Sequence, residues 1–147
     1  MTMTTSQDTL QNQFQTMVTH RRYLHQHPEL SFQETNTAAF IAQQLSSYGI
    51  AVQTQVGGNG VIGFIQGGYP GPTIAFRADF DALPITDQKD VPYKSTIDGV
   101  CHACGHDGHT AALLGFAYVL QQNHESLHGN IKLIFQHAEE KPPGGAK

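Results

Sequence analysis

The chain has 147 residues, of which 39% are hydrophobic and 14% charged, with a formal net charge of -4. This length suits one domain with a hydrophobic core, and the low charge excludes a disordered polyelectrolyte. Its eight Lys and Arg residues form no basic run, so we expect neither a nucleic-acid nor a membrane partner.

The N-terminal part predicts two helices. Residues 7–26 place apolar side chains at helical spacing, Ser6 is positioned to cap them, and the His27-Pro28 pair ends the helix. Ser31 and Glu34 then form a capping-box pattern. The second helix has an apolar face made of Ala38, Ile41, Leu45 and Tyr48, and Gly49 ends it.

The hydrophobic period then changes. Residues 50–55, 60–66 and 73–80 are short, rich in Val, Ile and Phe, and separated by Gly and Pro, which predicts three strands. Residues 67–72, with the sequence GGYPGP, are expected to form the tight turn between the last two.

The second half predicts a loop over residues 82–100, a helix over about 107–124 and a strand over 130–137. The helix is apolar on nearly all sides, as buried helices are. The order of these elements predicts an α/β layered domain. The chain stops in a Gly/Pro loop where such a unit normally continues into a covering helix, so we expect it to be part of a longer protein.

Nothing in the sequence directs the chain out of the cytoplasm. The first ten residues, MTMTTSQDTL, have neither a cationic start nor an apolar core. The longest nearly apolar run, residues 111–120, is shorter than the roughly 20 residues that cross a bilayer. We therefore expect a cytoplasmic protein, in which two cysteines do not make a disulfide framework.

The stretch GVCHACGHDGHT, residues 99–110, concentrates metal-ligand side chains. Cys104 and His106 are two apart, so in an extended loop both side chains reach the same ion, and thiolate and imidazole suit zinc-like metals. Asp107 is placed to cap the following helix. His109 lies one turn into that helix, as a third ligand or as the partner of a ligand, and spacing alone leaves both open.

An alternative interpretation of the same stretch is a redox pair made of Cys101 and Cys104, which form a C-x-x-C motif. A further interpretation is that the two cysteines form half of a structural zinc site. Both are disfavoured, because the sequence has no other cysteine and a long loop precedes the motif.

Two other stretches carry carboxylates at element boundaries. Glu139 and Glu140 end the last strand, where one can bind a metal while the other takes a proton from water held by that metal. Asp79 and Asp81 follow another strand, the usual place for ligands in open α/β sheets. Alone, the glutamate pair is better interpreted as a solvated strand end, and the aspartate pair is a weak signal because two aspartates in a turn can serve only to cap backbone amides. Together with the Cys/His stretch, the two pairs predict a metal site.

Four blocks of the sequence resemble the N-terminal part of a two-metal aminoacylase/carboxypeptidase family, in the branch of hippurate hydrolases, N-acyl-amino-acid amidohydrolases and auxin-conjugate hydrolases. They are RRYLHQHPELSFQE (21–34), FRADFDALPI (76–85), GVCHACGHDGHTAALLG (99–115) and QHAEEKPPGGA (136–146). The resemblance implies a partial three-layer α/β/α zinc-peptidase-like catalytic domain over residues 1–147, cut before the lid and dimerisation domain.

The resemblance also implies roles for individual residues. Cys104, His106 and Glu140 match the family's metal ligands, Glu139 its general base, and Asp81 the carboxylate that orients the site. The complete enzyme would use two divalent ions, Zn or Mn with Co or Ni as alternatives, to hydrolyse the amide of an N-acyl amino acid or a peptide-like conjugate. The remaining ligands and any homodimer contacts would lie in the longer protein, so we expect these 147 residues to be inactive alone.

Overall fold

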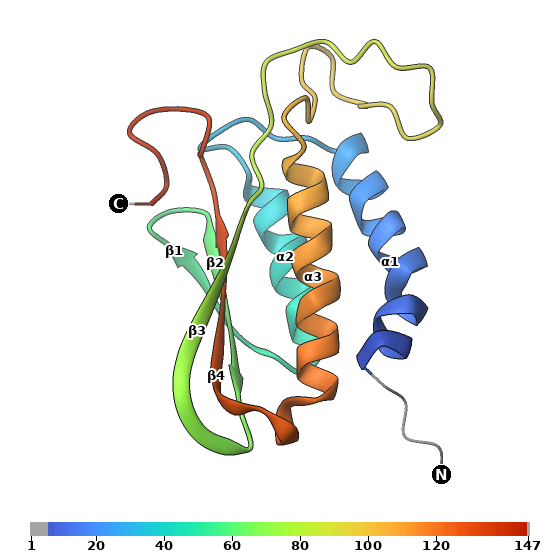
Figure 1. Cartoon of the computed structure of the whole chain (residues 1–147). Coiled ribbons are helices and arrows are strands. Elements are labelled where there is room, and N and C mark those ends of the chain that lie inside the picture. Colours follow the sequence, from blue (N-terminus) through green and yellow to red (C-terminus); the bar gives the residue numbers. More distant parts are fainter. Residues whose placement is uncertain (1–5, 147) are drawn as a thin grey trace.

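The computed structural model describes residues 6–146, with side chains described from residue 11. Its helices are α1 (Ser6–Gln26), α2 (Thr35–Ser47) and α3 (His106–Gln122), and its strands are β1 (Ala51–Val56), β2 (Gly60–Gln66), β3 (Tyr69–Asp79) and β4 (His128–Gln136), with a 3-10 turn at His124–Ser126. The predicted order of two helices, three strands, a helix and a strand is confirmed (Figure 1).

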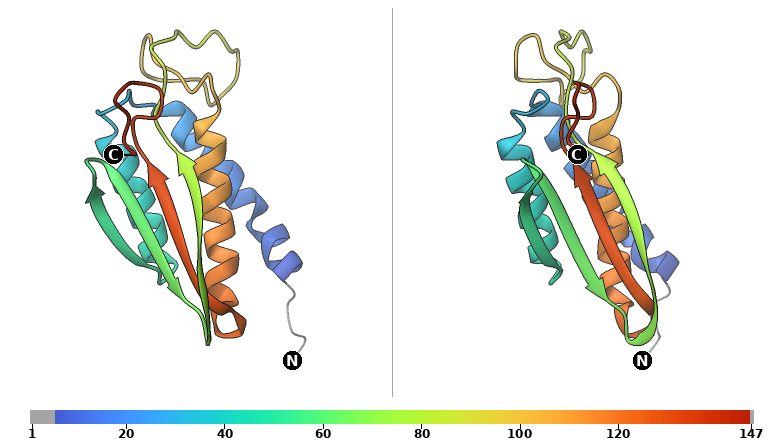
Figure 2. Two further views of the ribbon diagram at one scale, coloured as in Figure 1. Left: turned by 60° about the vertical axis from the view of Figure 1, so that its left-hand side comes forward. Right: turned by 90° about the vertical axis from the view of Figure 1, so that its left-hand side faces the viewer.

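The strands form one sheet in the order β1-β2-β4-β3. β2 pairs antiparallel with both β1 and β4, whereas β3 and β4 are parallel. A parallel pair needs a long crossover, which the predicted loop after β3 and helix α3 supply. The carboxyl ends of β3 and β4 therefore meet at the same end of the sheet, where the connecting loops gather (Figure 2).

The three helices lie on one side of this sheet (Figure 1). α2 and α3 contact the strands, and α1 packs on α3. Because strand side chains alternate between faces, β2 and β4 bury one set against the helices and leave the other set on the opposite face, where Phe64 is 39% exposed. Residues 6–146 thus build two layers of the expected three-layer domain. The buried set is Val61, Ile65, Ile131, Leu133 and Phe135.

The predicted capping box is wrong. α2 begins at Thr35, Glu34 is its N-cap without a side-chain bond to the helix, and Ser31 lies outside it. The carboxylate of Glu29 instead accepts hydrogen bonds from the backbone N–H groups of Asn36 and Thr37, at 3.2 and 2.7 Å. An upstream carboxylate thus satisfies the free amides of the helix start, which releases Ser31 and Glu34 for other contacts.

Other boundaries shift by a few residues. β3 begins at Tyr69, inside the predicted turn of residues 67–72, because prolines are tolerated on an edge strand. α3 begins at His106 with Gly105 as its N-cap, so Asp107 lies in the first turn and does not cap it. Ser6 begins α1, and its predicted capping role lies outside the described side chains. Among residues 6–146, no helix combines the length and hydropathy needed to span a membrane.

The two faces of the sheet should respond differently to truncation. Leu133 is fully buried between sheet and helices, so Leu133→Ala is expected to lower the free energy of unfolding by about 2–5 kcal/mol, because a cavity remains. Phe64→Ala, on the open face, should lower it by clearly less. Urea unfolding of both variants measures this, and equal losses would contradict the assignment of faces.

Candidate metal centre

Segments far apart in the sequence place the predicted site residues at one end of the sheet. Asp79 is the last residue of β3, and Asp81 follows it. Glu139 and Glu140 follow β4, and His106 opens α3. The parallel pairing of β3 with β4 aligns Asp79 with Gln136, so both groups of carboxylates face the start of α3.

His106 lies at the centre of this arrangement, with its side chain 3% exposed. Its Nδ1 lies 3.1 Å from a carboxylate oxygen of Asp81 and 3.0 Å from the carbonyl oxygen of the same residue. Both are acceptors, so Nδ1 carries the proton and donates. The Nε2 lone pair of the neutral ring is then free for a cation, as in carboxylate–histidine–metal arrangements.

Three of the predicted ligands come together around Nε2. Ligand atoms of Cys104, His106 and Glu140 lie within 4.8 Å of one another. Gly105, between Cys104 and His106, has a left-handed backbone (φ 107°). A turn therefore brings the two side chains together, whereas the spacing predicted an extended loop. Glu140 Oε1 is buried without a hydrogen-bond partner in the described part of the chain. An orphaned carboxylate oxygen beside a thiol and an imidazole fits a bound cation.

The centre has an excess of negative charge. His106 Nε2 lies 3.5, 3.8 and 3.6 Å from carboxylate oxygens of Asp79, Glu139 and Glu140. Burial lowers the pKa of His106, but the hydrogen bond to Asp81 and the charges of Asp79 and Asp81 outweigh it and raise that pKa. The neighbouring Glu140 carboxylate, followed by burial, raises the pKa of the Cys104 thiol. The Cys104 thiol and the His106 ring both hold their protons more tightly because the surrounding carboxylates attract positive charge. A bound metal ion would supply that positive charge in place of the protons.

Asp81 is fixed by three segments. Its carboxylate accepts hydrogen bonds from the Ser31 hydroxyl (2.7 Å) and from the Glu140 backbone N–H (2.9 Å), in addition to His106. Burial alone would raise the pKa of Asp81, but these donors outweigh it and hold the pKa well below its usual range. Asp81 is therefore a carboxylate that orients His106 and the turn carrying Glu140.

That turn depends on a contact from the N-terminal part of the chain. Ala138 has a left-handed backbone (φ 48°) and its N–H donates to Glu34 Oε1 at 2.8 Å. The other Glu34 oxygen accepts from Asn59 at 3.1 Å. Glu34 is fully buried, so it fixes the bend that directs Glu139 and Glu140 toward His106.

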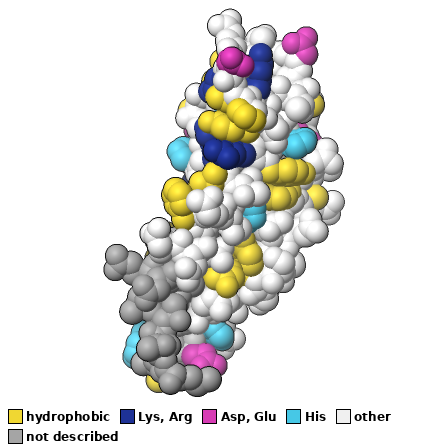
Figure 3. Space-filling model, turned by 90° about the vertical axis from the view of Figure 1, so that its right-hand side faces the viewer, with side chains coloured by type: hydrophobic (Ala, Val, Ile, Leu, Met, Phe, Trp, Pro, Cys, Tyr) yellow, Lys and Arg dark blue, Asp and Glu magenta, His cyan; other side chains and the backbone are white. Residues whose placement is uncertain are grey.

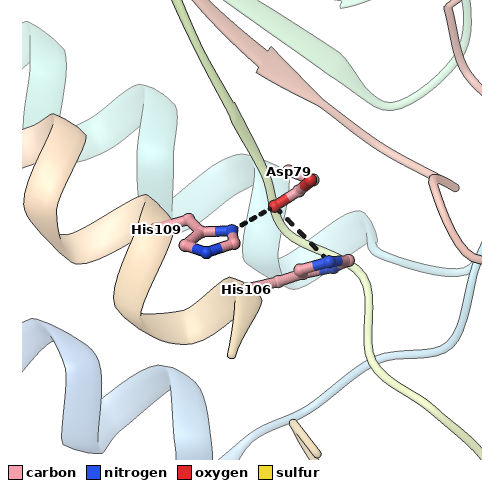
Figure 4. A group of neighbouring side chains, drawn as sticks. All are labelled: Asp79, His106 and His109. Carbon is pink, nitrogen blue, oxygen red and sulfur yellow. Dashed lines mark hydrogen bonds and ion pairs between the residues drawn. The ribbon is translucent and has the colours of Figure 1, made fainter. Parts of the chain in front are cut away.

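His106 also belongs to a second group of possible metal ligands. Ligand atoms of Asp79, His106 and His109 also lie within 4.8 Å of one another, and Figure 4 shows Asp79 between the two rings. His109 Nδ1 lies 2.7 Å from Asp79 Oδ1, and Arg77 pairs with the other oxygen at 3.0 Å. The single free nitrogen of His106 binds one ion, so the two groups are alternatives for that nitrogen.

The cysteines of the C-x-x-C pair differ in their surroundings. Both are free, with Cys101 buried and Cys104 exposed. The backbone of Cys101 exchanges two 3.1 Å hydrogen bonds with Leu83, closing the base of the long loop. Burial raises the pKa of the Cys101 thiol, which makes it a poor nucleophile at neutral pH.

Comparison with known proteins shows which family the sequence resembles. The family described as Peptidase family M20/M25/M40 matches the chain from residue 75 to residue 147. YhaA of Bacillus subtilis, a protein named as an amidohydrolase, is 62% identical over 134 residues, and the N-acetyl-L-cysteine deacetylase of the same organism is 51% identical over 127 residues. The matches cover 91% and 86% of this chain, but 34% and 30% of those proteins.

A solved M20 structure has the same fold. The Bacillus subtilis YXEP protein, a dinuclear metal-binding peptidase of the M20 family, superposes with a TM-score of 0.85 at 46% identity. The superposition covers 88% of this chain and 36% of that one. The resemblance inferred from the four sequence blocks is confirmed, as is the expectation of a partial M20 catalytic domain; the chain spans about a third of its curated relatives.

Sequence reasoning missed two residues, upstream of residues 75–147, that hold the site in place. Ser31 and Glu34 fit a helix-cap pattern, yet they fix Asp81 and the turn after β4. The signal that could have found them is the RRYLHQHPELSFQE block, which resembles the family at positions that have no assigned chemical role. Asp79, for which the sequence predicts no specific role, faces both His106 and His109.

Asp81 offers a direct test of ligand orientation. Asp81→Asn is expected to weaken Zn²⁺ binding about 10–100-fold, because an amide does not hold the Nδ1–H form of His106 as a carboxylate does. Isothermal titration of the metal-free chain measures this, with Asp98→Asn, an exposed aspartate of the long loop, as the control. Unchanged affinity in Asp81→Asn would contradict the orienting role.

Proposed function

We propose that this chain is the metal-binding N-terminal segment of an enzyme that hydrolyses the amide bond of N-acyl amino acids or related peptide-like conjugates. The observation that carries the proposal is the group Cys104, His106 and Glu140, whose ligand atoms lie within 4.8 Å of one another. One of them is the buried Glu140 Oε1, which has no hydrogen-bond partner among the described residues. The match of residues 75–147 to the M20 family and the N-acetyl-L-cysteine deacetylase among the relatives support the same chemistry.

The three ligands would hold one divalent ion, and the complete enzyme would bind two. Bound cations would polarise the amide carbonyl and lower the pKa of water. Thiolate, imidazole and carboxylate together suit Zn²⁺, while Mn²⁺, Co²⁺ and Ni²⁺ accept the same donors. The description of the YXEP protein as dinuclear supports the count of two.

Glu139 is the proposed general base. Its side chain is 41% exposed, and a carboxylate oxygen lies 3.8 Å from His106 Nε2. It is therefore beside the ligands yet open to water, whereas Glu140 is turned inward. Glu139 would take the proton of the attacking water and return it to the leaving amine. Asp81 would keep His106 in the form that leaves Nε2 free.

A pocket beside the ligands offers a place for the substrate. It measures about 280 Å³, and Glu140 and Ser31 lie at its polar side. Leu30, Ala82, Leu83 and Pro84 form the apolar side. Backbone bridges between Leu30 and Ala82 and between Leu83 and Cys101 brace this wall. We propose that the apolar wall takes the acyl group or the side chain of the amino acid.

The location in the cytoplasm, the homodimer of the complete protein and the inactivity of this segment alone stay predictions. The redox alternative on Cys101 and Cys104 is a second candidate, and the different burial of the two cysteines disfavours it.

Metal content separates the two candidates. After dialysis, elemental mass spectrometry of the chain should find close to one metal per chain, lost in Cys104→Ser and retained in Cys101→Ser. Cys101 is the matched control because it is a cysteine of the same motif outside the ligand group. Metal retained in Cys104→Ser, or lost equally in both variants, would contradict the ligand assignment.

Glu139 can be separated from the ligands by its chemistry. In a full-length enzyme carrying this segment, Glu139→Gln should retain metal but lower the rate of N-acetyl amino acid hydrolysis at least about 10²-fold, because the amide accepts no proton. The 147-residue chain should show no turnover. Full activity of the variant would refute the base, and robust turnover by the short chain would refute its expected inactivity.

A further inference from the structure

A buried group of charged side chains lies behind the metal centre and takes no part in the proposed chemistry. Its centre is His25, near the carboxyl end of α1, which is fully buried. Its Nδ1 lies 2.6 Å from Asp107 Oδ2, and its Nε2 lies 3.2 Å from Asp87 Oδ2. One imidazole thus bridges the first turn of α3 and the long loop that follows β3.

Each partner of His25 is held by further donors. Asp107 also accepts from Arg21 Nε at 2.9 Å and from the backbone N–H of Gly108 at 2.9 Å. The backbone N–H of Ser95 lowers the pKa of Asp87, against its burial and with the help of Lys89. Both carboxylates are therefore fixed, and the His25 ring lies between them.

Other groups also face His25. Lys89 Nζ lies 3.4 Å from His25 Nε2 and 3.2 Å from Asp87 Oδ1. The rings of Tyr93 and His102 lie at centroid distances of 5.9 and 6.4 Å. The ring is thus surrounded by side chains of the long loop and of the segment just before Cys104.

The same end of α1 also binds the loop of residues 86–100 through hydrogen bonds. The Gln26 side chain donates to the Pro92 carbonyl at 3.1 Å, and the Gln26 carbonyl accepts from the Thr96 hydroxyl at 2.6 Å. The guanidinium groups of Arg21 and Arg22 lie over the Tyr93 ring. Figure 3 shows Lys and Arg side chains gathered toward this end of the α1 face. The loop continues directly into Cys104 and His106.

We propose that the buried ring of His25 joins α1, the loop of residues 86–100 and the start of α3, and so positions Cys104 and His106 for the metal. This inference rests on the proposed metal site. His25 is a positioning residue: it acts through Asp107, the neighbour of His106, and through Asp87, which anchors the loop that leads to Cys104. Without it, Asp107 and Asp87 would lose the buried bridge between them.

The experiment compares His25→Gln and Asp87→Asn with His20→Gln. His20 is a matched control because it is a buried histidine of the same helix that packs on Phe40, away from the loop. Each variant of the full chain is measured by urea unfolding, by amide hydrogen exchange of residues 101–109 without metal, and by Zn²⁺ titration. Asp87→Asn keeps the test decisive if His25→Gln does not fold.

We expect His25→Gln and Asp87→Asn to speed exchange of residues 101–109 at least about tenfold and to weaken Zn²⁺ binding about 10–100-fold. His20→Gln should do neither at a comparable loss of stability. Equal exchange in all three variants would overturn the proposal.

The same experiment distinguishes failure of the metal site from failure of this inference. If the unaltered chain binds no Zn²⁺, the proposed ligand group fails, while the exchange rates still decide the positioning role. If Zn²⁺ binds and all three variants keep its affinity within twofold, the ligand group stands and the positioning role falls.

Discussion

The carboxylate of Asp81 is the contact on which the metal centre depends. It receives the Ser31 hydroxyl, the His106 ring and the Glu140 backbone N–H, and so holds the linker before α2, the start of α3 and the turn after β4 in one place. A buried carboxylate is costly unless its oxygens are satisfied. The three donors satisfy it, and the segments that provide them thereby become fixed relative to one another.

Around this contact, the sheet sets the position of the candidate ligands. Parallel pairing of β3 and β4 places their carboxyl ends together, and the crossover returns α3 to the same end. The described helices cover one face of the sheet (Figure 1). The opposite face, with Phe64 exposed on β2, carries none of Cys104, His106 and Glu140.

The sequence predicted the elements and the gathering of Cys104, His106 and Glu140, but not the contacts that hold them. Helices and strands follow from local periodicity, and these three residues follow from residue type and from the family resemblance. Ser31 meets Asp81 across 50 positions and Glu34 meets Ala138 across 104, and no local pattern encodes such pairings. Ser31 and Glu34 were misassigned because their spacing satisfies a helix-cap rule, while Glu29 performs that task.

The contact between Glu34 and the Ala138 backbone also has a consequence for how the molecule acquires its structure. During synthesis the first partner emerges 104 positions before the second, and β2 can join β3 in one sheet only once β4 is present, because that strand lies between them. Contacts of such long range are slow to form, since the chain loses entropy before it gains them. Cys104 and His106 are likewise synthesised before Glu140, so the group of three can be complete only once the 137–140 turn is ordered.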